Sequence, residues 1–145
     1  MSGHTSRLAT LKLVRVIRKV ADCPCPKHQA AFLRQLQRMD KLICKIGKGA
    51  VPGDGRYITQ PGDDMGVTTA VAHGHTFILA FPSISAARRH DPTATYAGLE
   101  RDAVLQMALD NPAFKGVLVT SSSNDAAWGA VTRQQIVDLF GLESR

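Results

Sequence analysis

Residues 66–82 read GVTTAVAHGHTFILAFP and hold two candidate strands around a tight turn. β-Branched and aromatic residues bounded by Gly and Pro are typical of strands, and Gly74 can adopt the positive φ of a short hairpin turn. The second run, residues 76–81, is almost wholly apolar, which predicts a central strand covered on both faces. Ser83 follows and can cap a helix over residues 84–90.

The length and composition of the chain predict one globular domain. Of its 145 residues 44% are hydrophobic, so the core needs neither a disulfide nor a metal to fold. Residues 8–20 are too short and too basic to cross a bilayer, and no signal-peptide pattern is present. Three cysteines cannot all pair. We therefore expect a cytoplasmic protein without a membrane span and without a cofactor.

Positive charge is concentrated at the front of the chain. The net charge is +6, but residues 1–60 contain 12 Lys and Arg against 3 Asp, which makes that segment +9. A basic surface can meet nucleic acid, an anionic membrane surface or an acidic protein. A solvated helix face is the alternative interpretation.

Two amphipathic helices are expected in this basic segment, one over residues 8–21 and one starting at Pro26. The expected apolar stripes are Leu8, Leu11, Val14, Ile17 and Ala21 in the first helix, and Phe32, Leu33, Leu36 and Met39 in the second. The basic residues away from these stripes are the predicted partner-binding set: Arg15, Arg18, Lys19, Arg34, Arg38 and Lys41. Trp128, in a loop of small residues, joins this set as an interface anchor, although it could equally cover the edge of the core.

The rest of the chain alternates strands and helices. The expected elements are a strand at 42–46, a long loop at 47–64 with a short strand at 57–59, a helix at 100–111, a buried strand at 116–120 and a last helix capped by Thr132. This order predicts an α/β (α+β) domain over residues 8–145, a mixed sheet packed with amphipathic helices, after a flexible segment at 1–7.

Cys23, Cys25 and His28 form a C-x-C-x2-H pattern, and Cys44 is a possible fourth metal ligand. Zinc accepts these atoms in a tetrahedron. The spacing is not that of a zinc finger, however, and a free cysteine also packs as a small hydrophobe. We therefore expect no structural zinc.

Three further positions carry weak catalytic signals. His73 and His75 would point to one face of a strand and could act as an acid and a base, while Ser121 follows a buried strand. Ser121 lacks the G-x-S-x-G elbow of serine hydrolases, and no orienting carboxylate accompanies the histidines. A small hydrolase is therefore a third function hypothesis, behind the two that follow.

The order of elements resembles the SseB-like family, the N-terminal domain of proteins linked to type III secretion and to enhanced serine sensitivity. The resemblance rests on the hairpin ending in Phe77-Ile78-Leu79-Ala80-Phe81-Pro82-Ser83 and on residues 84–89, 96–99, 102–110 and 115–119. It implies a bacterial α/β domain that binds other proteins without catalysis, in secretion or as a toxin-neutralising immunity protein. Nucleic-acid binding by the basic front helices is the alternative.

Overall fold

The protein has a mixed α/β fold in a computed structural model that describes residues 7–23, 25–48, 55–57, 65–121 and 128–143. The helices are α1 (Arg7–Asp22), α2 (Pro26–Gln37), α3 (Ile84–His90), α4 (Arg101–Asp110) and α5 (Arg133–Phe140). The strands are β1 (Lys41–Lys48), β2 (Gly55–Tyr57), β3 (Met65–Val67), β4 (Thr69–Ala72), β5 (His75–Ala80), β6 (Thr95–Glu100), β7 (Gly116–Thr120) and β8 (Trp128–Thr132). The predicted fold class is therefore confirmed.

These strands form two four-stranded sheets, ordered β2-β3-β1-β6 and β4-β5-β7-β8. The expected hairpin is β4–β5, and its turn has positive φ at both His73 (53°) and Gly74 (78°), the pattern of a type I′ turn. β5 pairs in parallel with β7, which pairs antiparallel with β8. The central strand is covered as predicted, because Phe77 to Ala80 are all buried.

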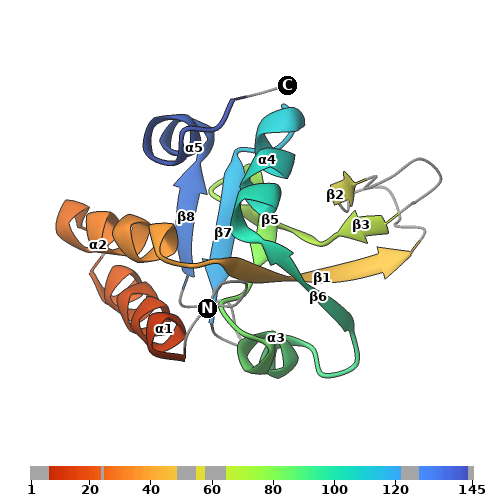
Figure 1. The fold of residues 1–145 in the computed structure, drawn as a ribbon, viewed down its shortest axis with the longest axis horizontal. Coiled ribbons are helices and arrows are strands. Elements are labelled where there is room, and N and C mark those ends of the chain that lie inside the picture. The colour runs from red at the N-terminus through yellow and green to blue at the C-terminus, as the bar shows by residue number, and fades with distance from the viewer. Residues whose placement is uncertain (1–6, 24, 49–54, 58–64, 122–127, 144–145) are drawn as a thin grey trace.

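Alternate residues of β5 and β7 point into two separate clusters of the core. Ile78 and Val117 belong to a large cluster that also contains buried residues of α1, α2, α4 and α5. Leu79 and Leu118 belong to a smaller cluster with two alanines of α3. Figure 1 shows α1 and α2 side by side. It shows α3 at the end of the sheet where β5 finishes.

The two sheets are joined where β5 ends. Ile43 in β1 and Phe81 exchange both backbone hydrogen bonds, at 2.9 and 2.8 Å. In Figure 1 β1 runs across the direction of β7 and β8. This bridge fixes the backbone just before Ser83, and so it fixes where α3 begins.

The predicted apolar stripe of α1 is confirmed at Ile17 and is wrong at its start. Leu13, Ile17 and Val20 are buried, whereas Leu8 and Leu11 are 61% and 60% exposed. The buried and the exposed apolar residues of α1 both have helical spacing. The face that carries Leu8 and Leu11, however, also carries Arg15 and Arg18. Burying that face would place guanidinium groups in the core, at a high free-energy cost.

Strand β8 was missed because its sequence is rich in small residues. The region around Trp128 was expected to be a loop, but Trp128–Thr132 pairs with β7 over its whole length. Gly129 has a packing role, since a Cβ there would lie 2.7 Å from the Phe32 ring. Of the predicted strand at 57–59, β2 includes Tyr57, and residues 58 and 59 lie outside the described residues.

Candidate functional site

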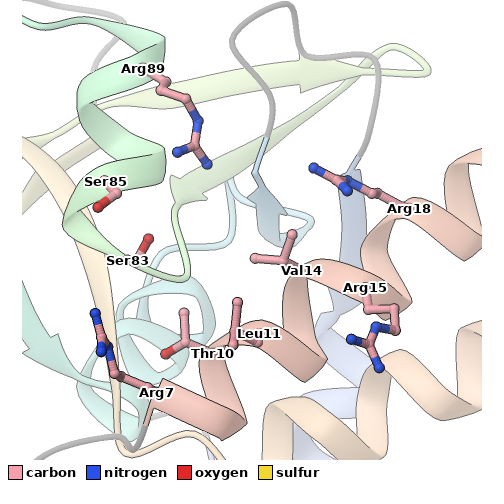
Figure 2. Close-up of a pocket in the computed structure, with 9 residues that line it drawn as sticks. All are labelled: Arg7, Thr10, Leu11, Val14, Arg15, Arg18, Ser83, Ser85 and Arg89. Atoms are coloured by element: carbon pink, nitrogen blue, oxygen red, sulfur yellow. The ribbon is translucent and has the colours of Figure 1, made fainter.

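A hollow of about 640 Å³ lies between α1 and α3. We call it the α1–α3 hollow, and Figure 2 shows the side chains around it. They come from one face of α1, from the start of α3 and from its last turn. The lining residues are Arg7, Thr10, Leu11, Val14, Arg15, Arg18, Ser83, Ser85 and Arg89.

Helix α1 supplies its share of the lining through regular spacing. The six residues from Arg7 to Arg18 recur at three- and four-residue intervals, so they form one stripe along the helix. This stripe lies away from Leu13 and Ile17, which are fully buried. The core therefore holds α1 by one face while the other face lines the hollow.

Helix α3 is held in place by its first and last residues. The Ser83 hydroxyl caps the helix by accepting a hydrogen bond from the Ala86 N–H at 3.1 Å. At the other end, the Tyr96 hydroxyl lies 2.8 Å from the Ala87 carbonyl oxygen and 2.7 Å from that of Asp91. Ser83 and Ser85, which follow β5 directly in the chain, are thereby placed in the lining of the hollow.

The hollow is positively charged and has an apolar floor. Four of its nine lining residues are arginines, and none is acidic. In the described part of the chain, no acidic side chain forms an ion pair with any of these four arginines. Figure 2 shows Arg18 and Arg89 on opposite sides of the space, with Val14 between them. Guanidinium groups bind carboxylates and phosphates, often in bidentate fashion, so the arrangement suits an anionic group that carries apolar atoms.

The structure divides the predicted basic set. Arg15 and Arg18 line the hollow, whereas Arg34 and Arg38 are exposed in and just after α2, outside the lining. Lys19 is exposed in the last turn of α1, also outside the lining. Lys41 begins β1 opposite Glu100, away from the hollow.

Trp128 begins β8 and is half-buried. It packs against the smaller core cluster, and its indole lies 5.7 Å from the His73 ring, centroid to centroid. At least part of its surface therefore belongs to the core, and its role as a partner anchor stays a prediction. His73 and His75 are exposed at the hairpin tip.

Cys23, Cys25 and His28 come together at the turn between α1 and α2, which we call the α1–α2 corner. Their ligand atoms all lie within 4.8 Å of one another. A hydrogen bond from the His28 backbone N–H lowers the pKa of Cys25, and the hydrogen bond of Cys23 to Cys25 raises the pKa of Cys23. Cys44, the suggested fourth ligand, is instead buried in β1, where burial raises its pKa to about 12.

Of the nine lining residues only Arg15 and Arg18 were predicted as site residues, and the missed ones include two arginines, Arg7 and Arg89. Arg7 could have been predicted, because it has helical spacing with Arg15 and Arg18 on α1. Arg89 could not, because only the fold brings α3 next to this face of α1. Ser121, the third weak catalytic signal, is buried.

No family model, curated protein or solved structure matches this chain. The resemblance to the SseB-like family therefore stays a prediction. Among the described residues, no helix is both long enough and apolar enough to span a membrane.

Proposed function

We propose that this chain is a non-catalytic binding protein whose α1–α3 hollow takes an acidic segment of another protein. The supporting observation is the gathering of four arginines from two helices around an apolar floor, without an acidic residue in the lining. Carboxylates of the partner would pair with the guanidinium groups, which would raise the association rate and set the register of the segment.

The floor of the hollow favours a protein segment over nucleic acid. Leu11 is 60% exposed and lies beside Val14 in the lining, and Leu8 is also exposed one turn earlier. Apolar side chains of a partner would cover these residues and gain roughly 25 cal/mol per Å² of apolar area buried. Recognition of single-stranded nucleic acid commonly adds aromatic residues that stack on bases, and none is in the lining.

Nucleic acid remains the second candidate, because four arginines also suit phosphates and the front of the chain is strongly basic. The resemblance to SseB-like proteins supports the first candidate. It suggests a search for the natural partner among bacterial secretion components and toxins, in the cytoplasm. In that setting the protein would act as a secretion-associated factor or as an immunity protein.

The test compares two triple charge reversals of equal size. One changes three residues of the hollow, R15E/R18E/R89E, and its matched control changes three exposed residues of α2 and its end, K27E/R34E/R38E. Binding of a short peptide that alternates Glu with Leu is measured by fluorescence anisotropy, beside the same peptide with Gln for Glu. An exposed ion pair contributes about 0.2–1 kcal/mol, so three reversals in the hollow should weaken binding by about tenfold or more.

The control variant should keep most of the affinity, and the Gln peptide should bind weakly to every form. Equal losses in the two variants would mean that overall charge, and not the hollow, attracts the peptide. Binding of a single-stranded oligonucleotide of matched charge is measured in the same way, to test the nucleic-acid alternative. If it binds more tightly than the peptide, with a steep salt dependence that the hollow reversals remove, the nucleic-acid function replaces the proposed one.

A further inference from the structure

The α1–α2 corner brings three soft ligands together outside the hollow. The two thiol sulfurs of Cys23 and Cys25 and a ring nitrogen of His28 lie within 4.8 Å of one another. In a tetrahedral zinc site, with Zn–S near 2.3 Å and Zn–N near 2.0 Å, neighbouring ligand atoms are roughly 3.5–3.8 Å apart. The upper limit on the ligand spacing at the corner therefore exceeds the spacing in a tetrahedral zinc site by about 1 Å.

The backbone of the corner holds this arrangement without help from a metal. The Cys23 N–H donates to the Lys19 carbonyl at 2.9 Å, which extends the hydrogen bonding of α1 by one residue. The Cys25 N–H donates to the Cys23 carbonyl at 2.7 Å, and the Gln29 N–H donates to the Cys25 carbonyl at 3.0 Å. Since α1 and α2 also pack against each other, little ordering of the chain would remain for metal binding to supply.

One nitrogen of the His28 ring already has a backbone hydrogen-bond partner. Its Nδ1 lies 2.8 Å from the Cys23 carbonyl oxygen, and because a carbonyl can only accept, Nδ1 must donate. In the neutral ring the lone pair is then on Nε2, the nitrogen that can bind a metal while this hydrogen bond persists. A backbone carbonyl on the other ring nitrogen is a common outer-shell partner in zinc sites.

We propose that Cys23, Cys25 and His28 form a Zn²⁺ site with three protein ligands and a fourth position open to solvent. Cys23 is exposed, so the ion can enter directly. The site would add stability to the corner by binding the folded chain, while the core forms without it. The proposal replaces the expectation of no structural zinc, because the three ligands meet at a corner between two helices and not in a zinc finger.

The experiment uses the full chain, reduced and freed of metal, and titrates it with Zn²⁺ in competition with a chromogenic chelator. Co²⁺ serves as a spectroscopic probe, because thiolate coordination gives it charge-transfer absorption. The variants are Cys23→Ser, Cys25→Ser and His28→Asn, and the matched control is His75→Asn at an exposed histidine elsewhere. Circular dichroism establishes that each variant is folded.

We expect one Zn²⁺ per chain, a tetrahedral Co²⁺ spectrum with thiolate bands, and a higher thermal midpoint with zinc. Removal of a residue that only supports a metal ligand lowers metal affinity by roughly 10- to 100-fold. Each variant of the α1–α2 corner removes a ligand itself and should lower the affinity for Zn²⁺ by more than this. His75→Asn should bind Zn²⁺ as the wild type does. Undiminished binding by the double variant C23S/C25S would overturn the proposal. So would a wild-type chain that takes up no more zinc than this variant.

Discussion

The pairing of β7 with β8 makes a quantitative prediction at Gly116. A Cβ placed on this residue would lie 1.9 Å from the Val131 carbonyl oxygen and 2.9 Å from the Thr132 Cα. Both neighbours are backbone atoms, so no side chain can rotate away. Gly116→Ala must push the start of β7 from the end of β8, the strand that leads directly into α5.

The expected loss of stability follows from two opposing effects. Overpacking of a filled site typically costs 1–3 kcal/mol, and a backbone clash belongs at the upper end of this range. Replacing Gly also restricts the unfolded chain, which returns about 0.4–1 kcal/mol. We therefore expect the free energy of unfolding to fall by about 2 kcal/mol, with a decrease in the thermal midpoint of roughly 5–8 °C.

The assay is urea unfolding followed by circular dichroism, with Gly98→Ala as the matched control. Gly98 is also in a strand, but a Cβ there would meet only Ile43 Cδ1 at 3.5 Å, an ordinary contact. Gly98→Ala should be neutral or slightly stabilising. If Gly116→Ala is as stable as Gly98→Ala, the register that places Gly116 opposite Thr132 is wrong.

Three further outcomes are expected. Arg133 donates to carbonyl groups at the end of α4 and just beyond it, so Arg133→Met should lower the free energy of unfolding by about 1.5–3 kcal/mol, as measured in urea. At about pH 8, Ellman's reagent should titrate the two thiols of the α1–α2 corner in the native protein, and Cys44 only after unfolding. The Lys45 ammonium, 3.1 Å from Asp91, lowers the pKa of that carboxyl. The pair therefore stabilises the fold above the usual Asp pKa and ceases to do so as the pH falls through the lowered value. Lys45→Met should be less stable than the wild type near pH 6, and urea unfolding should show this difference shrinking as the pH falls through the lowered pKa of Asp91.

The sequence predicted those helices and strands whose residue pattern lies within one short stretch of the chain. The hairpin could be read because alternation, a His73-Gly74 turn and the apolar run of β5 all lie within 17 residues. Strand β8 could not be read, because Gly129 and Ala130 have low strand propensity. Only the Phe32 ring, brought from α2, explains why glycine is at position 129.

The site was predicted only in part, for the same reason. The basic character of α1 is visible in the sequence, but which of its two apolar faces is buried depends on the arginines that share the exposed face. The α1–α3 hollow joins residues 7–18 to residues 83–89, and no local pattern reports such a contact. The α1–α2 corner is local, but its backbone turn, rather than the ligand spacing, brings the three ligands together.

The central claim is that the α1–α3 hollow is the binding surface, and amide shift mapping by NMR tests it most directly. The ¹⁵N-labelled chain is titrated with the Glu–Leu peptide at moderate salt. The account predicts that the largest shifts follow the α1 stripe, at Thr10 and Val14, and continue at Ser83 and Ser85 in the facing segment. Shifts that cluster at the exposed arginines 34 and 38, with the stripe unchanged, would contradict it.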